Sequence, residues 1–259
     1  MRIQEHWIIY KTLLNREIIR VLRIWPQTLL PSVITITLYF LIFGKVFGEK
    51  VGNVNGCDYM HFITPGLIIM AVINNSFINV VSSFFSARFS RSIEELFVSP
   101  APNYLIILGY ISGGIFRGLS VGTLVSVVAF LFDGFSFPIH SYLLVIITFF
   151  CCGTLFSLGG LLNGIFSKKF DDTTIFSAFV LIPLVYLGGI FYSLNELPPI
   201  WQSISKCNPL FYIVDFVRFS FSGAYVVSPY VSFLSIIALI IILYAFAWYL
   251  IYRGFTLKP

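Results

Sequence analysis

The sequence has 259 residues, of which 58% are hydrophobic and 10% are charged. A soluble domain carries about 25% charged residues, so most of this surface must face lipid rather than water. The formal charge is +5, and in a membrane protein the excess Lys and Arg residues are expected on cytoplasmic loops and beside anionic headgroups rather than in a nucleic-acid interface. We expect membrane lipid, and no nucleic acid, as a partner.

Residues 1–26 predict an amphipathic helix in the cytoplasmic headgroup layer. Apolar residues recur every three or four positions, and basic residues form a separate row with the same period. The apolar row is Trp7, Tyr10, Leu14, Ile18, Val21 and Trp25, and the basic row is Arg16, Arg20 and Arg23. Pro26 is expected to end the helix before the chain enters the membrane. Two roles stay open, a mechanical link to a partner and a plain membrane-surface anchor.

Six apolar segments approach or exceed the length of about 20 residues that a bilayer crossing needs. They are 28–47, 62–85, 105–132, 142–166, 174–192 and 230–252. The whole chain, 1–259, is predicted to be a single all-α integral membrane domain. An apolar stretch within 194–222 is too short to cross, and it predicts a re-entrant helical hairpin between the fifth and sixth spans.

The distribution of Lys and Arg predicts that both termini are cytoplasmic. With the N-terminus inside, eleven basic residues lie on the inner side and four on the outer side. The inner residues are Arg2, Lys11, Arg16, Arg20, Arg23, Arg88, Arg91, Lys168, Lys169, Arg253 and Lys258, and the outer ones are Lys45, Lys50, Lys206 and Arg218. We expect a multi-pass protein of the plasma membrane, which is the inner membrane in a Gram-negative organism. Cys57 and Cys207 fall outside, where free thiols are expected and a disulfide is the alternative.

No motif for catalysis or nucleotide binding occurs in the sequence. The phosphate-binding Gly-x-x-x-x-Gly-Lys-Ser/Thr loop is missing, as are His-Glu-x-x-His and Gly-x-Ser-x-Gly. We therefore expect no catalytic residue, metal site or bound cofactor. If the chain pumps a substrate, ATP and magnesium must be used by another polypeptide.

The loop 86–103, between the second and third spans, predicts an exposed cytoplasmic helix. The residues at helical spacing on its polar side are Arg88, Arg91 and Glu95, and the grouped apolar residues are Ile93, Leu96 and Phe97. Pro100 and Pro102 are expected to end the helix. Insertion into a groove on a soluble partner and an ordinary connector held by charge pairs are both consistent with this pattern.

Three ordered motifs resemble the type-2 permeases of ATP-binding-cassette (ABC) transporters. The Glu94-Glu95-Leu96 core followed by Ser99-Pro100-x-Pro102 is similar to their coupling helix. Asn15-Arg16-Glu17-Ile18-x-Arg20 precedes a proline-containing turn, as in that family. The most specific match is the series Gly188-Gly189-Ile190-Phe191-Tyr192, Leu197-Pro198-Pro199-Ile200-Trp201 and Asn208-Pro209-Leu210-x-Tyr212-x-Val214-Asp215-x-x-Arg218. The resemblance covers essentially the whole chain.

This resemblance implies the transmembrane subunit of an ABC exporter, a homodimer driven by two separate ATPase subunits. It assigns ATPase coupling to Arg88, Arg91, Glu94, Glu95 and Leu96, and an exit-side gate to Pro198, Pro199, Asn208, Pro209, Asp215 and Arg218. A static external cap is the alternative to a gate, and Asp215 and Arg218 can neutralise each other on one helix. The substrate is expected to be a small hydrophobic or amphipathic compound, a lipid or a glycan. The rival function is an ATP-independent channel or membrane scaffold.

Polar and small residues inside the spans indicate conduit lining or helix packing. Arginine at a helix centre costs about 2.5–3.5 kcal/mol, so such a residue usually faces protein or a water-filled cavity. Arg117 could line the conduit, or it could snorkel to the inner surface if the span begins near Ser112, and we expect a structural pairing. Asn75 and Asn79 share a face of the second span and suit either a conduit or hydrogen bonds between helices. Glycines at four-residue spacing predict close helix packing. These are Gly114, Gly118 and Gly122 in the third span, and Gly160 and Gly164 in the fourth.

Overall fold

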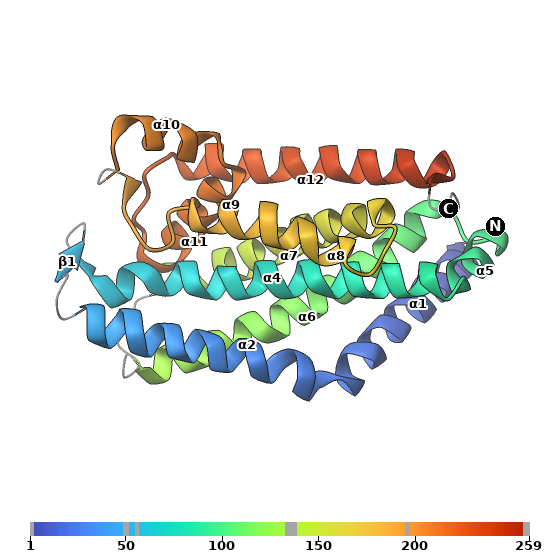
Figure 1. The fold of residues 1–259 in the computed structure, drawn as a ribbon, viewed down its shortest axis with the longest axis horizontal. Helices are drawn as coiled ribbons and strands as arrows, with labels where there is room; N and C mark the ends of the chain where they lie inside the picture. Colours follow the sequence, from blue (N-terminus) through green and yellow to red (C-terminus); the bar gives the residue numbers. More distant parts are fainter. Residues whose placement is uncertain (1–2, 49–51, 55–56, 133–138, 195–196, 256–259) are drawn as a thin grey trace.

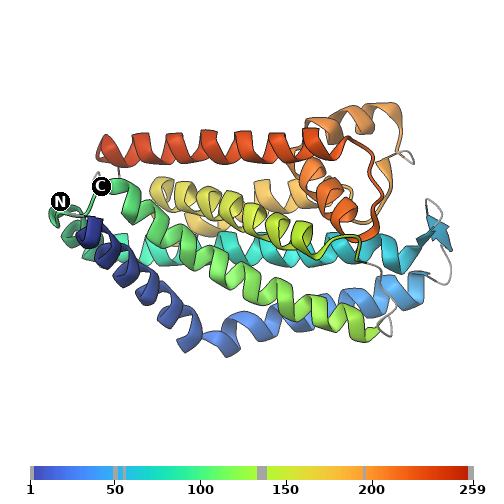
Figure 2. The ribbon, with the colours of Figure 1, turned by 180° about the vertical axis from the view of Figure 1, so that it is seen from behind.

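The computed structural model describes residues 3–48, 52–54, 57–132, 139–194 and 197–255. Long helices run side by side along one axis (Figure 1). Both termini lie beside the short helix α5 (Ser92–Val98) at one end, which we call the α5 end (Figures 1 and 2). The opposite end, which we call the α10 end, carries α10 (Pro199–Cys207) and strand β1 (Asn53–Val54).

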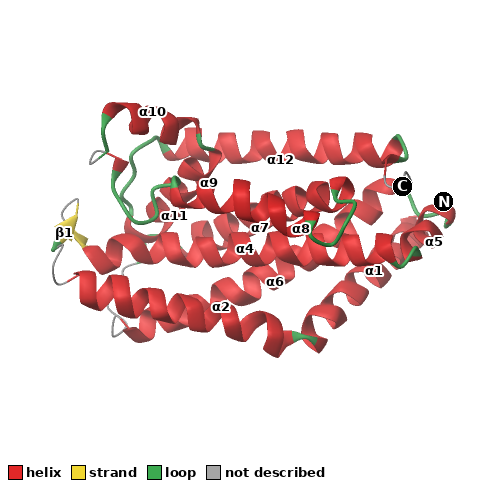
Figure 3. Ribbon diagram, viewed as in Figure 1, coloured by secondary structure: helices red, strands yellow, loops and turns green. Residues whose placement is uncertain are grey.

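Five helices among the described residues are long and apolar enough to cross a bilayer. They are α2 (Trp25–Tyr39) with the first part of the π-helix η1 (Phe40–Phe47), α4 (Tyr59–Phe89), α6 (Asn103–Phe132), α7 (Tyr142–Phe166) and α12 (Pro229–Tyr252). Each overlaps one predicted span, and α7 has the predicted bounds. Apart from the two-residue strands, the described chain is helices and loops (Figure 3).

The predicted fifth span, 174–192, corresponds to one shorter apolar helix, Asp172–Tyr186. It consists of α8 (Asp172–Phe176), the π-helix η2 (Ser177–Leu181) and α9 (Ile182–Tyr186), and a turn follows. At 1.5 Å per residue this run is about 22 Å long, whereas the hydrocarbon layer is about 30 Å thick. A sixth span therefore stays a prediction.

Helix α4 is the centre of the bundle and packs against both α6 and α7. In the most apolar 18-residue stretch of α4, 78% of the residues are buried inside the protein. The corresponding share is 22% for α2 and for α12, so most apolar side chains of these two helices are left to contact lipid. A Cβ atom at Gly160 would lie 2.5 Å from the Phe77 carbonyl oxygen, and one at Gly122 would lie 2.6 Å from the Val72 side chain. The close packing predicted from the glycine repeats is present, because only glycine fits at these contacts.

Helix α1 (Ile3–Arg23) meets α2 at an angle beside Pro26, as predicted (Figures 1 and 2). It packs on α6 through the buried row Leu13, Glu17 and Val21. Trp7 and Trp25 are 63% and 49% exposed, so they lie outside this contact. Other members of the predicted apolar row do contact the protein, since Val21 is buried and the Tyr10 hydroxyl lies 2.9 Å from that of Ser112 on α6. The predicted apolar face is therefore divided, and its exposed tryptophans are left for the membrane.

The α10 end is built from short elements. Strand β1 pairs antiparallel with β2 (Cys57–Asp58), and α10 is followed by α11 (Pro209–Ser222). The helices expected within 194–222 are present, and their insertion into the bilayer as a re-entrant pair stays a prediction. Cys207 is a free, exposed thiol, whereas the Cys57 side chain lies outside the described residues.

Candidate functional site

Helix α5 is anchored in the bundle by one apolar side chain. Ile93 is 1% exposed and belongs to a buried cluster with Phe84 and Tyr110. Arg91, just before the helix, has a φ of 57°, a left-handed conformation that is uncommon outside glycine. This residue turns the chain sharply between α4 and α5, and α5 then ends at Val98 before Pro100.

The outward side of α5 carries exposed charged and apolar residues. Glu94 and Glu95 are exposed, and within the described part of the chain their carboxylates have no hydrogen bond or ion pair. Phe89 and Val98 flank the helix and are 82% and 87% exposed. Such a surface combines two apolar anchors with two free carboxylates, which suits contact with another protein.

The predicted common face of Arg88, Arg91 and Glu95 is not formed. Arg88 lies in the last turn of α4, and its Nη1 donates to the carbonyl oxygens of Ile165 at 2.7 Å and Ser167 at 3.0 Å. The carbonyl groups at the C-terminal end of α7 have no partners within that helix, and a guanidinium satisfies them well. Arg88 therefore ties α4 to α7 instead of lying on α5.

A buried carboxylate holds α1 against α4 at this end of the molecule. Glu17 is 1% exposed, and its Oε1 and Oε2 accept from Ser83 Oγ at 2.9 and 2.8 Å. Arg16 and Arg20 each lie 3.2 Å from this carboxylate. Arg20 Nη2 also donates to the side-chain and backbone oxygens of Asn79, at 2.8 and 3.0 Å. The row of arginines expected at headgroups is thus partly engaged in the protein.

A second polar network lies deeper, between α2, α4 and α6. Arg117 is 7% exposed, and its Nε donates to Asn75 Oδ1 at 3.2 Å. Asn75 Nδ2 donates to Ser32 Oγ at 3.0 Å and to the Ala71 carbonyl at 2.9 Å. Arg117 therefore has the protein partner that we expected, although this partner is an amide rather than a carboxylate.

Asn75 also lines a groove between α2 and α4. This groove has a volume of about 210 Å³, and its polar side chains include Ser32, Thr35 and Asn74. It is the most polar of the described cavities that lie along the spans. Asn79, in contrast, is fully buried and binds Arg20, so only Asn75 has access to a groove.

At the α10 end, Asn208 joins α11 to α9. Its Oδ1 accepts from the Leu210 backbone N–H at 2.9 Å and caps α11, while Pro209 occupies the first turn. Its Nδ2 donates to the Leu184 carbonyl at 2.7 Å. Pro198 and Pro199 are exposed where α10 begins, so they shape that helix rather than line a buried site.

Asp215 and Arg218 bind two different loops instead of forming the expected direct pair. The two Asp215 oxygens accept from the backbone N–H groups of Val226 and Val227, both at 2.9 Å. Arg218 Nη2 donates to the Gly189 carbonyl at 2.9 Å, and its guanidinium lies 4.0 Å from the centre of the Phe62 ring. Each charged side chain thus pairs with backbone groups of a loop, which have no partner within a helix. Through these bonds α11 holds the loop at Val226 and Val227 and the turn at Gly189.

The family comparison agrees with this arrangement of short interfacial helices and long spans. The family model described as "ABC-2 type transporter" matches residues 9–222, which is most of the chain. The chain belongs to the ABC-2 type transporter family. As a member of this family, it is a membrane transport permease whose apolar helices make it a multi-pass membrane protein.

Individual ABC-2 relatives cover long stretches of the sequence. "Inner membrane transport permease YadH" of Escherichia coli K12 is 48% identical over 253 residues, which is 98% of either chain. "Nodulation protein J" of Sinorhizobium fredii is 25% identical over 183 residues, 70% of this chain and 68% of its own. "Nodulation protein J" of Rhizobium meliloti is 22% identical over 182 residues, 70% and 69% of the two chains. The similarity to the inner-membrane permease YadH supports an inner-membrane location for this ABC-2 permease.

The sequence did not predict that Glu17 of this ABC-2 permease is buried. The available signal was its place between Leu13 and Val21, at four-residue spacing, which puts all three on one helical face. A carboxylate on an otherwise buried row must have partners, because an unpaired buried charge is costly. Ser83 on α4 supplies one, which sequence spacing does not reveal.

Proposed function

We propose that this ABC-2 permease is the membrane-spanning subunit of an ATP-driven exporter. Two copies form the pathway, and two separate ATPase subunits bind at the α5 end and hydrolyse ATP with magnesium. The permease itself binds no nucleotide. The substrate is a small hydrophobic or amphipathic compound, a lipid or a glycan, and it moves away from the cytoplasm across the inner membrane.

The exposed surface of α5 is the observation that carries this proposal. A docking segment must present free groups to its partner and transmit force to the spans. Glu94 and Glu95 meet the first requirement, since they are exposed and unpaired among the described residues. Ile93 meets the second, because it fixes α5 in the same buried cluster as Phe84 of α4.

The groove between α2 and α4 is the proposed lining of the pathway. Asn75 and Ser32 give it hydrogen-bonding groups, and Arg117 lies directly behind Asn75. The outward face of α2 is largely apolar and exposed. A second copy facing this groove would enclose it, which a single chain does not do.

The orientation of the proposed exporter follows from its charges. The two ends of the described chain lie with α5 at one end (Figure 1), and Arg88 and Arg91 of the predicted inner set directly precede α5. We assign the α5 end to the cytoplasm and the α10 end to the exit side. Helices α10 and α11 would then form the exit gate, with Asn208, Asp215 and Arg218 setting its contacts to α9 and to the loops.

Co-purification separates the exporter from the rival ATP-independent channel or scaffold. A tagged permease should bring down an ABC ATPase from its own membranes. Glu94→Lys with Glu95→Lys should release that ATPase, whereas Asp171→Lys, an exposed reversal outside α5, should not. A permease that never retains an ATPase would favour the channel or scaffold.

A further inference from the structure

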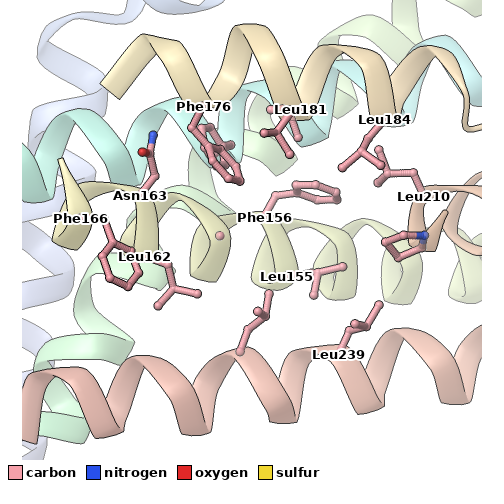
Figure 4. Close-up of a pocket in the computed structure, with 15 residues that line it drawn as sticks. Leu155, Phe156, Leu162, Asn163, Phe166, Phe176, Leu181, Leu184, Leu210 and Leu239 are labelled. Atoms are coloured by element: carbon pink, nitrogen blue, oxygen red, sulfur yellow. The ribbon is translucent and has the colours of Figure 1, made fainter. Parts of the chain in front are cut away.

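A long apolar groove lies between α7, α12 and the continuous helical run α8–η2–α9 (Figure 4). Its cavity volume is about 410 Å³, and Asn163 is the only polar side chain among the 15 residues that line it. Asn163 Nδ2 already donates to the Thr173 carbonyl at 2.9 Å. The groove thus offers an occupant apolar contacts and almost no hydrogen bonds.

The shape of the groove follows α7. Lining residues run from Leu155 to Phe166, and this stretch of helix is about 17 Å long. In Figure 4, Phe176 extends from the upper helical run toward α7, and Leu162 extends from α7 toward α12. At Gly159 the groove has unused space, since a Cβ atom there would meet only the Phe77 ring, at 3.7 Å. A long space with an almost entirely apolar lining fits a hydrocarbon chain.

Basic residues gather where the groove reaches the α5 end. Phe166 marks this mouth, with its ring 6.3 Å from that of Phe246 on α12. Lys168 and Lys169 follow directly and are exposed, and within the described part of the chain their ammonium groups have no hydrogen bond or ion pair. Arg253, also exposed, ends α12 on the other side of the mouth.

Among the described residues, the acidic residues of this loop form no close ion pair with the two lysines, although the lysine charges also act on the Asp172 carboxyl. Asp172 accepts from the backbone N–H groups of Lys169 and Lys168, both at 2.9 Å. These bonds lower the pKa of the Asp172 carboxyl and fix the turn from which both lysine side chains extend. Asp171, the other carboxyl group of the loop, is exposed.

We propose that this groove is a phospholipid site, in which one acyl chain lies between α7 and α8–η2–α9 and the phosphate binds Lys168 and Lys169. The occupant should come from the bilayer, because the groove lies among apolar helices and the exposed basic residues at its mouth are of the kind that collect beside lipid headgroups. The phosphodiester group, common to anionic and zwitterionic phospholipids, is what the two ammonium groups recognise. This site does not depend on whether the permease exports.

The headgroup, not the chain, sets the strength of this site. Moving an acyl chain from bilayer to groove exchanges one apolar surrounding for another, so packing alone drives that step. A basic residue near the membrane surface contributes about 1 kcal/mol toward anionic lipid, which is about fivefold in affinity. Replacing both lysines should therefore weaken retention by about 25-fold if the two act independently.

Lipid retention by the purified full-length permease tests the proposal. Native mass spectrometry would count the phospholipids that survive detergent exchange in the parent protein, in Lys168→Glu with Lys169→Glu, and in Gly159→Leu, which fills the groove. Lys206→Glu, at the α10 end, and Ile146→Phe, at an exposed position of α7, are the matched controls. Both test variants should lose bound lipid, and both controls should keep it.

Photolabelling gives a second measurement should Gly159→Leu fail to fold. A phosphatidylglycerol or a phosphatidylethanolamine with a photoreactive acyl chain should label Leu162 and Phe176 above the level at Ile146, and the lysine double variant should lower that excess. Equal labelling of all exposed apolar surfaces would mean bulk lipid only and overturn the proposal. Conversion of a dimer to a monomer by Gly159→Leu would also overturn it, since a second copy would then fill the groove.

Discussion

The Glu17 carboxylate of α1 accepts hydrogen bonds from the Ser83 hydroxyl of α4 at 2.8 and 2.9 Å, in a contact that is almost free of solvent. Helix α4 ends at Phe89, directly before the turn into α5. The N-terminal helix is therefore joined to the same helix that leads to the proposed ATPase-docking segment. This relationship favours the mechanical role of α1 over a plain membrane anchor.

Glu17→Ala should weaken the attachment of α1. The substitution leaves the buried Ser83 hydroxyl without its acceptor and removes the carboxylate that Arg16 and Arg20 share, so a loss of about 1–3 kcal/mol is expected. Thermal unfolding in detergent should show a lower midpoint for Glu17→Ala than for Lys11→Ala, an exposed position of α1. Equal midpoints would show that the carboxylate holds nothing in place.

Gly113→Ala should separate α1 from α6. A Cβ atom at Gly113 would lie 2.6 Å from Cβ of Glu17, close to the α1 backbone, where little adjustment is available. Gly159→Ala is the matched change in α7, because its new Cβ meets the Phe77 ring at an ordinary 3.7 Å. Removing glycine from a helix is worth about 0.5–1 kcal/mol, so Gly159→Ala should be neutral or stabilising. Thermal midpoints of the two variants should therefore shift in opposite directions, or at least differ clearly.

Adjacent asparagines on α4 allow a test of the Arg117 network. Asn75 is buried and bonds Ser32, Ala71 and Arg117, whereas Asn74 lines the groove without a hydrogen bond among the described residues. Asn75→Ala should cost about 1–3 kcal/mol, since it leaves buried groups unpaired. Asn74→Ala should stay within about 0.5 kcal/mol of the parent protein. The same loss of stability at both positions would argue against the network.

Cysteine accessibility tests the assigned orientation and the sixth span together. A membrane-impermeant maleimide added to spheroplasts should label Cys207 and cysteines placed at 53–56 or 194–206, the segments predicted to be external. Cysteines placed at 88–102 or at 168–172 should react only after the membrane is opened. Labelling of Lys168→Cys from the outside would break the six-span model. Labelling of Lys168→Cys and Cys207 from the same side would mean that residues 172–186 do not complete a crossing.

Apolar run length was enough to find the long helices, because little else satisfies the backbone inside a bilayer. The segment 174–192 was predicted as a full span, whereas the helix covers only Asp172–Tyr186 and contains a π-helical turn at Ser177–Leu181 that composition does not reveal. Within the candidate site, the sequence identified Glu94, Glu95 and Asn75 as polar residues in notable places.

The sequence did not predict which residues these side chains, or the other site residues, would contact. Arg88 was expected on the docking helix because the sequence shows spacing but not the left-handed turn at Arg91. Asp215 and Arg218 were expected to meet because they lie three residues apart, yet loops approaching from either side provide closer groups. Long-range contacts of this kind depend on how the helices pack, which local periodicity does not encode.

The central claim is that an ATPase acts through α5, and ATP turnover by the reconstituted complex tests it most directly. The parent permease, the Glu94→Lys with Glu95→Lys variant and the Asp171→Lys control would be compared in nanodiscs with equal amounts of ATPase. We predict that the double reversal lowers permease-stimulated turnover while membrane insertion stays intact, and that the control matches the parent. Unchanged stimulated turnover in the double variant would contradict the account.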